Sequence, residues 1–91
     1  MTKMSIVVYS KNNCVFCNKA KHLLTKLGLD YEEMKLEEFD SPEAMLEHIG
    51  KPVRTMPQIK IDDVLIGGYN QLIEYYADKG KVNFKGEVIS E

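Results

Sequence analysis

Cysteine is scarce in this sequence, with only two in 91 residues, and this scarcity argues against a small domain held together by disulfides. Secreted domains of that kind usually carry four or more cysteines. The chain is instead 44% hydrophobic, which is sufficient for a core of its own. Its length allows one domain and is too short for two independent cores. We therefore expect one compact domain in a reducing cytoplasm, that of the host if the chain is viral.

Long apolar runs and an excess of one charge are also missing. No segment approaches the roughly 18 to 20 apolar residues that span a bilayer, and the first apolar run is too short for a signal peptide. The 12 basic residues are spread among 14 acidic ones, which gives a net charge of -2. This composition predicts neither a membrane protein nor a nucleic-acid-binding protein.

The pattern of apolar residues predicts an α/β domain. Short β-branched or alternating runs indicate strands, and apolar residues at i, i+3, i+4 and i+7 indicate helices. Asp62 and Asp63 form a two-residue turn, so the strands on either side are antiparallel. The first strand, helix and second strand form a right-handed parallel crossover, and the resulting mixed sheet has helices on both faces. The predicted strands are 6–9, 31–39, 58–61 and 64–66, and the predicted helices are 15–27, 42–49 and a segment from about residue 70 to Gly80.

Cys14 and Cys17 lie where the first predicted helix begins. A pair at this spacing is compatible with a metal site, a structural clip or a redox couple. His22 and His48 could complete a zinc site, but they are 26 positions apart and lack the close spacing of zinc-binding histidines. Positions i and i+3 lie on the same side of a helix, so the two sulfurs can meet. C-x-x-C near a β-α-β pattern indicates thioredoxin-like chemistry, in which one thiolate attacks a disulfide and a second thiol resolves the product.

The attacking thiol must be ionised, and the sequence offers several groups that favour ionisation. At a reference pKa near 8.5, only about 3% of a thiol is ionised at pH 7. Lowering the pKa of Cys14 by three units would require about 4 kcal/mol, whereas a helix N-terminus typically supplies about 0.3 to 1 kcal/mol. Backbone N–H groups of residues 15–17 and the cation of Lys11 are the additional candidates. A solvated loop lysine is the alternative interpretation of Lys11.

Three motifs occur in a characteristic order: CVFC at 14–17, TMP at 55–57 and IGGY at 66–69. With these motifs the chain resembles the glutaredoxins, particularly the short ones of bacteria and bacteriophages. The resemblance covers about residues 5–78. It implies a thioredoxin fold, with a four-stranded mixed sheet flanked by three helices, in a domain of residues 1–80, followed by a C-terminal tail of residues 81–91. The tail itself either adds a short strand or trails from the domain.

The resemblance also implies residue roles. Cys14 matches the nucleophile and Cys17 the resolving cysteine, while Lys11 matches a lysine that assists the thiolate and a glutathione carboxylate. Pro57 matches a cis-proline, and the preceding residue offers its backbone to the glutathione peptide. The glycine pair and the following helix start would hold the γ-glutamyl carboxylate. The implied substrate-binding residues are Lys11, Phe16, Thr55, Met56, Pro57, Gly68, Asn70 and Gln71, and no metal ligand is implied.

The sequence departs from the family pattern at two places. Val15 and Phe16 replace the usual Pro-Tyr, which keeps an aromatic surface but loses a hydroxyl and loosens the helix start. Asn70 and Gln71 replace Thr or Ser followed by Asp, so recognition of the γ-glutamyl amino group is expected to be weaker or water-mediated. Arg54 is a further cation that could reach a substrate carboxylate or form a surface salt bridge.

The function implied by the resemblance is that of a glutathione-dependent thiol-disulfide oxidoreductase that reduces protein disulfides and glutathione mixed disulfides. We expect a monomer with glutathione as co-substrate, no permanently bound cofactor, and ribonucleotide reductase as a client. One alternative is a redoxin that takes electrons from thioredoxin reductase and passes them to ribonucleotide reductase. The other is a module that binds a [2Fe-2S] cluster through glutathione between two protomers. The bulk of Val15 argues against this second alternative.

Overall fold

The sheet has four strands in the order β2-β1-β3-β4 in the computed structural model, which describes residues 5–80, 82 and 83. Strands β1 and β2 are parallel, and the pairs β1–β3 and β3–β4 are antiparallel. This arrangement confirms the predicted mixed sheet with a parallel crossover. The strands are β1 (Ile6–Ser10), β2 (Glu32–Lys35), β3 (Gln58–Ile61) and β4 (Val64–Gly67).

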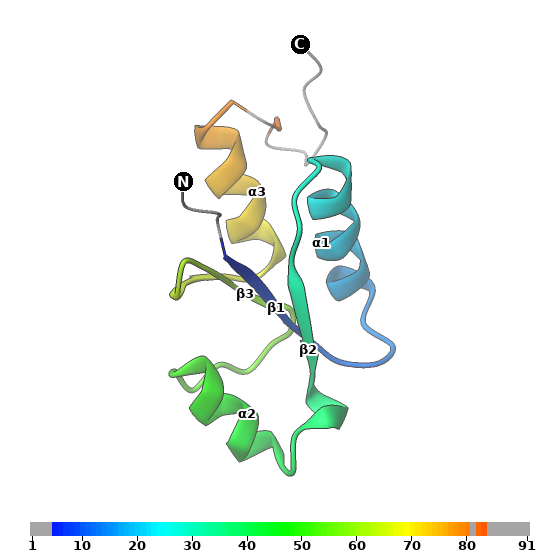
Figure 1. The fold of residues 1–91 in the computed structure, drawn as a ribbon, viewed down its shortest axis with the longest axis vertical. Helices are drawn as coiled ribbons and strands as arrows, with labels where there is room; N and C mark the ends of the chain where they lie inside the picture. The colour runs from blue at the N-terminus through cyan, green and yellow to red at the C-terminus, as the bar shows by residue number, and fades with distance from the viewer. Residues whose placement is uncertain (1–4, 81, 84–91) are drawn as a thin grey trace.

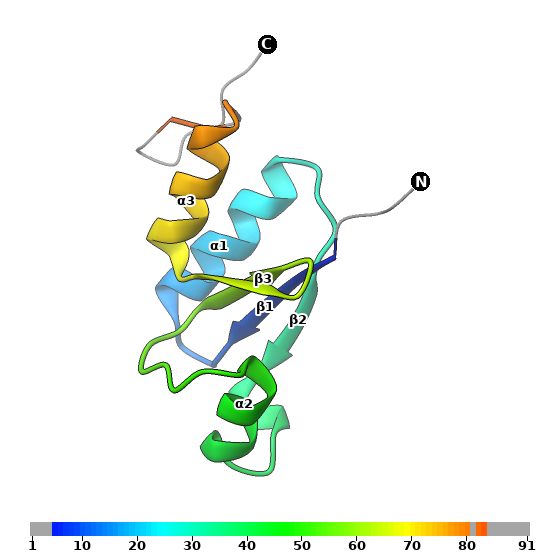
Figure 2. The ribbon, with the colours of Figure 1, turned by 90° about the vertical axis from the view of Figure 1, so that its left-hand side faces the viewer.

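Three α-helices flank this sheet: α1 (Val15–Lys26), α2 (Pro42–Ile49) and α3 (Tyr69–Asp78). Helices α1 and α3 run side by side, whereas α2 lies apart from them (Figures 1 and 2). The buried residues accordingly form two clusters. One joins α1 and α3 to the sheet, and the other joins α2 to it. The predicted helices on both faces are therefore confirmed.

The alternation of side chains along β1 explains the two clusters, because successive residues of a strand point to opposite faces. Val8 belongs to the cluster under α1 and α3, whereas Tyr9 belongs to the cluster under α2. Both side chains are almost completely buried, at 0% and 1% exposure. Both faces of this strand are thus covered by apolar clusters, and this is why its sequence is almost entirely apolar.

Local signals set the ends of the helices. The hydroxyl oxygen of Ser41 accepts a hydrogen bond from the Ala44 N–H at 3.1 Å, and Pro42 occupies the first helical position of α2. Gly28 and Gly50 follow α1 and α2 with φ values of 74° and 94°, a left-handed conformation that favours glycine. The predicted bounds of α2 match the structure at both ends.

The predicted strand 31–39 is wrong in its second half. Strand β2 ends at Lys35, and Leu36–Glu38 form a 3-10 turn. The Lys35 N–H donates to a carboxylate oxygen of Glu38 at 3.0 Å, which favours the turn over further pairing. Met34 and Leu36 both pack on the α2 cluster. These residues are two positions apart, and this spacing suggested that the strand continues. In the structure both side chains reach the same cluster, although the backbone changes from strand to 3-10 turn between them.

The predicted hairpin between β3 and β4 is confirmed. Asp62 and Asp63 both have positive φ, at 52° and 67°, as a two-residue turn of this kind requires. Ile61 and Val64 are paired directly beside the turn. The turn sets the pairing beside it, the register shifts between Ile59 and Lys60, and β4 then leads to the start of α3.

The predicted tail is largely outside the described residues, since 81 and 84–91 are not among them. Val82 is described, is 1% exposed and packs in the cluster of α1 and α3. The division at residue 80 stays a prediction. Among residues 5–80, 82 and 83, no helix combines the length and apolar character needed to cross a bilayer.

Candidate active site

Cys14 and Cys17 form a disulfide at the start of α1, as the redox interpretation requires. Cys14 is the N-cap residue, and its sulfur accepts a hydrogen bond from the Cys17 N–H at 3.2 Å. Cys14 is 8% exposed, whereas Cys17 is 1% exposed. The two cysteines therefore differ in exposure, and the more exposed one is also the one whose sulfur receives the backbone N–H. In the reduced protein this N–H would stabilise a thiolate on Cys14.

The histidines that could have completed a zinc site lie elsewhere. His22 is exposed on α1, and His48 Nδ1 is hydrogen-bonded to the Tyr9 hydroxyl at 2.7 Å in the α2 cluster. Among the residues that the structure describes, no group of three or more His, Cys, Asp or Glu side chains could hold a metal ion. The zinc interpretation thus has no support from the geometry.

The segment before β3 lies against the disulfide. The Met56–Pro57 peptide bond is cis, as the resemblance implies. The carbonyl oxygen of Met56 is 3.7 Å from Cys14 Sγ, although the two residues are 42 positions apart. The backbone of the TMP motif is consequently next to the more accessible sulfur.

Gln58, directly after this motif, is a residue that the sequence analysis missed. It is 6% exposed, and its Nε2 donates to the Thr55 carbonyl oxygen at 2.9 Å and lies 3.5 Å from Thr55 Oγ1. A buried amide that bonds to the backbone three residues earlier fixes the turn through Met56 and Pro57. The available signal was a polar residue directly after the TMP motif, at the start of a strand.

A groove beside the disulfide is lined by residues of all three motifs. It is lined by all of the predicted substrate-binding residues except Lys11, which is exposed in the loop before Cys14. Tyr69 also lines the groove, with its ring centroid 6.0 Å from that of Phe16, and was not predicted as a site residue. The signal for Tyr69 was its place in the IGGY motif. The lining residues are Phe16, Thr55, Met56, Pro57, Gly68, Tyr69, Asn70 and Gln71.

The two glycines of IGGY allow α3 to begin close to the cis-proline. A Cβ on Gly68 would lie 3.2 Å from the Pro57 carbonyl oxygen, and Gly67 has a φ of 119°. Gln71 Oε1 accepts a hydrogen bond from the Gly68 N–H at 3.0 Å. The side chain of Gln71 therefore caps the helix, and the helix start forms one wall of the groove.

An ion pair behind the disulfide joins α1 to β2. Lys21 Nζ is 2.8 Å from Glu33 Oε2, which also accepts a hydrogen bond from the Ser10 hydroxyl at 2.7 Å. Burial opposes ionisation of Glu33, but the hydrogen bonds from Lys21 and Ser10 outweigh it and lower the pKa of this carboxyl. Because Ser10 is the last residue of β1, this cluster ties down the start of the loop that carries Cys14.

Thioredoxin-fold oxidoreductases exchange electrons with other disulfides through a disulfide at the start of a helix. Here such a disulfide lies at the start of α1, beside a cis-proline and next to a four-stranded mixed sheet. This chain is a protein of that class. The fold and the cysteine pair together define it, whereas the groove distinguishes one family within the class from another.

Comparison with known proteins identifies the family. The Glutaredoxin family model matches residues 6–66. Glutaredoxin 1 of Escherichia coli is 33% identical over 72 residues, which cover 72% of this chain and 85% of that protein. The glutaredoxin of Haemophilus influenzae is 37% identical over 71 residues, which cover 71% of this chain and 82% of that protein. The chain belongs to the glutaredoxin family.

Solved structures agree with this assignment. Reduced Escherichia coli glutaredoxin has a TM-score of 0.69 and 30% identity over 81% of this chain and 94% of that one. A buckwheat glutaredoxin–glutathione complex has a TM-score of 0.69 and 31% identity over 81% of this chain and 69% of that one. The protein is thus a glutathione-dependent disulfide oxidoreductase, and Cys14 and Cys17 are its redox pair.

Proposed function

We propose that Cys14 is the attacking thiolate and Cys17 the resolving thiol in the reduction of protein disulfides and glutathione mixed disulfides. The observation that carries this assignment is the asymmetry of the pair. Cys14 is the more exposed cysteine, and its sulfur receives the Cys17 N–H at 3.2 Å. A nucleophile needs access and a stabilised negative charge, whereas a resolving thiol needs only to reach its neighbour.

The exchange steps balance as two-electron transfers. The Cys14 thiolate attacks one sulfur of the substrate disulfide, which forms a mixed disulfide and releases the other sulfur as a thiolate. Cys17 loses its proton and attacks Cys14, so the Cys14–Cys17 disulfide forms and the second substrate thiolate leaves. One glutathione thiolate then opens this disulfide by bonding to Cys14. A second glutathione thiolate attacks that bond, which yields oxidised glutathione and the Cys14 thiolate.

The groove is the proposed binding site for glutathione. The Met56 backbone would pair with the glutathione peptide, and Phe16 would cover its apolar surface. The start of α3, near Gly68 and Asn70, would hold the γ-glutamyl carboxylate through backbone N–H groups other than that of Gly68, which donates to Gln71 Oε1. Lys11 would attract the other carboxylate. Support comes from the groove that these segments share, and from the glutathione bound by the buckwheat relative.

Two cysteine variants test the assignment. Cys14→Ser should abolish turnover in an assay coupled to glutathione and glutathione reductase, because no sulfur remains to form the mixed disulfide. Cys17→Ser should retain deglutathionylation, since a second glutathione can resolve the Cys14 mixed disulfide directly. Wild-type turnover by the Cys14 variant, or complete loss in the Cys17 variant with Cys14 still alkylated by iodoacetamide, would refute the roles.

The electron donor is the finer part of the proposal. Gln71 stands where relatives carry an acid, and its Oε1 is already used by the Gly68 N–H. This observation favours weak recognition of the γ-glutamyl amino group and leaves thioredoxin reductase as the competing donor. Steady-state rates with each reductase at equal protein concentration separate the two. A cytoplasmic monomer that serves ribonucleotide reductase, with no permanently bound cofactor, is part of the same proposal.

A further inference from the structure

A second groove lies on the outer face of α1, directly beside the disulfide, and we name it the α1 groove. It is lined by Val15, Asn18, Lys19 and His22. Val15 stands between the two cysteines and is 65% exposed. Because Val15 directly follows Cys14, a chain that is bonded to Cys14 lies close to one end of this groove.

The charged side chains of α1 are all of one sign. The helix contains Lys19, Lys21, His22 and Lys26 and no acidic residue, and the first acid of the whole chain is Asp30. Neither the α1 groove nor the glutathione groove is lined by an acidic side chain. Since the whole protein has a net charge of -2, this local basic surface is at odds with the overall balance.

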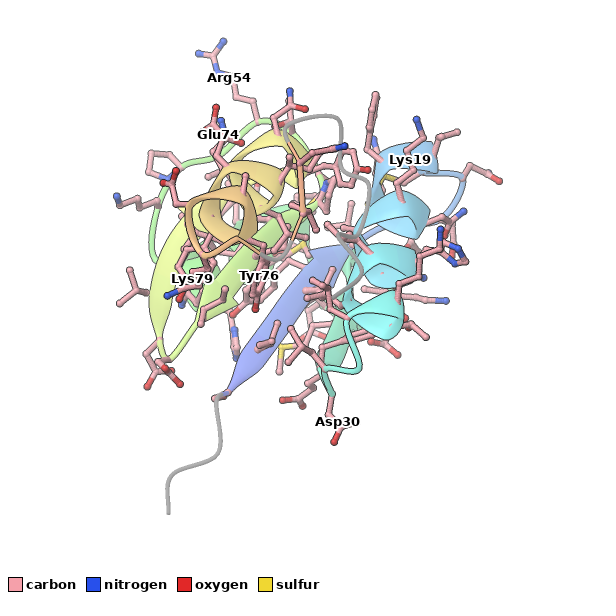
Figure 3. All side chains as sticks on the ribbon, turned by 90° about the horizontal axis from the view of Figure 1, so that it is seen from above. Lys19, Asp30, Arg54, Glu74, Tyr76 and Lys79 are labelled. Carbon is pink, nitrogen blue, oxygen red and sulfur yellow. A yellow bond between two sulfur atoms is a disulfide. The ribbon has the colours of Figure 1, made fainter. Side chains whose placement is uncertain are left out.

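Lys19 is an exposed cation on α1, two residues after Cys17. Lys21 is engaged by Glu33 at 2.8 Å, whereas Lys19 is exposed, with its Nζ 5.3 Å from the centroid of the Phe16 ring. A cation over an aromatic ring is held near it, so the positive charge stays close to the exposed residues between the cysteines. In Figure 3, Lys19 on α1 and Arg54 both project toward the upper edge of the view, and Glu74 lies on the Arg54 side.

We propose that the α1 groove docks the part of a client protein that flanks its disulfide, and that it selects clients with an acidic residue close to their cysteine. Val15 supplies apolar contact, Asn18 supplies hydrogen bonds, and Lys19 supplies the charge. This inference rests on the proposed function, because docking matters only if Cys14 attacks protein disulfides. Charge pairs of this kind act mainly on association and on the choice of partner.

Two model peptides test the proposal. Each contains the same internal disulfide and an apolar neighbour, and they differ only in carrying Glu-Glu or Lys-Lys beside the cysteine that Cys14 attacks. The pre-reduced protein is mixed with each peptide, the reaction is quenched with acid, and the second-order rate constants are measured by chromatography. The wild-type protein should reduce the acidic peptide about two- to fivefold faster, and the ratio should fall as salt is added.

Lys19→Glu and Lys26→Glu form a matched pair of variants. Both change the charge of α1 equally, but Lys26 lies in the last turn, about 10 Å along the helix from Lys19. Lys19→Glu should bring the acidic-to-basic ratio to one or below, whereas Lys26→Glu should keep most of the wild-type preference. Any effect of Lys19 on the reactivity of Cys14 affects both peptides equally and cancels in the ratio.

Several outcomes would overturn the proposal. These are a wild-type ratio of one, a ratio that Lys19→Glu does not change, and an equal change in both variants. A ratio that depends on protein concentration would mean that a second copy of the chain occupies the groove. Equal reduction of both peptides would leave the proposed function intact, whereas failure to reduce either peptide would refute that function too.

Discussion

Gln58 takes part in the site without any chemistry of its own. Its buried amide donates to the Thr55 carbonyl oxygen at 2.9 Å, and Thr55 begins the segment that places the Met56 carbonyl 3.7 Å from Cys14 Sγ. Removing the donor of this part-buried hydrogen bond is costly, and the turn that contains the Thr55 carbonyl becomes free to move. Gln58 is therefore a positioning residue for the groove.

Gln58→Leu should destabilise the protein by about 1 kcal/mol, the usual net value of one neutral hydrogen bond. It should also raise the KM for glutathione more than it lowers kcat, because the Met56 backbone is no longer held in place. Denaturant titration and steady-state kinetics measure the two effects.

Thr55→Val is the control for that variant, since it removes only the 3.5 Å contact to Oγ1 and keeps the carbonyl. It should cost less stability than Gln58→Leu. Equal losses in both variants, with no change in KM, would show that Gln58 only supports packing.

At the scale of elements, the carboxylate of Glu33 joins β2 to α1. Glu33 accepts from both Lys21 and Ser10, and these bonds lower its pKa despite the opposing effect of burial. A carboxyl whose pKa is lower in the folded state contributes stability above its unfolded value near 4.5. That contribution is lost as the pH falls through the lower folded value.

Glu33→Gln should therefore lower the free energy of unfolding by about 1 kcal/mol at pH 7, a modest value because the pair is partly exposed. The difference from the wild type should shrink as the pH falls below about 4.5 and through the lower folded value. Urea titrations at a series of pH values measure it. Glu32→Gln, an exposed neighbour in the same strand, should show no such dependence, and a constant difference for Glu33→Gln would contradict the pairing.

At the scale of the whole molecule, the core extends beyond α3. Val82 is 1% exposed and packs with residues of α1, α3 and the sheet. Val82 therefore contributes to the packing that holds α1 in position, and α1 carries the disulfide.

Val82→Ala should destabilise the protein by about 1 to 3 kcal/mol, through lost burial and the cavity that remains. Thermal unfolding should show a lower Tm by several degrees. The same substitution at Val64, which is 63% exposed, is the matched control and should cost less than about 0.5 kcal/mol. Equal stability of the two variants would mean that Val82 adds nothing to the core.

Much of the fold could be predicted from local patterns. The α2 bounds follow from Ser41, Pro42 and Gly50, and the hairpin follows from Asp62 and Asp63. The prediction was wrong after Lys35, where the capping by Glu38 outweighed an alternating pattern. At the site, the motifs predicted most of the groove, but Tyr69 was missed because its contact with Phe16 joins distant segments. Gln58 was missed because its burial comes from tertiary packing, although its hydrogen bond to Thr55 is local.

The sequence by itself determined the redox pair, the helix start beneath it and the order of strands and helices. Each of these depends on residues within a few positions of one another, where turn and capping preferences act. Only the tertiary structure decided that Met56 lies against Cys14 and that the start of α3 lies beside the cis-proline. It also decided that Val82 packs in the core and that a basic helix face lies near the disulfide. These features arise because the sheet brings distant segments together, and a pattern along the chain does not encode which distant side chains will share a surface.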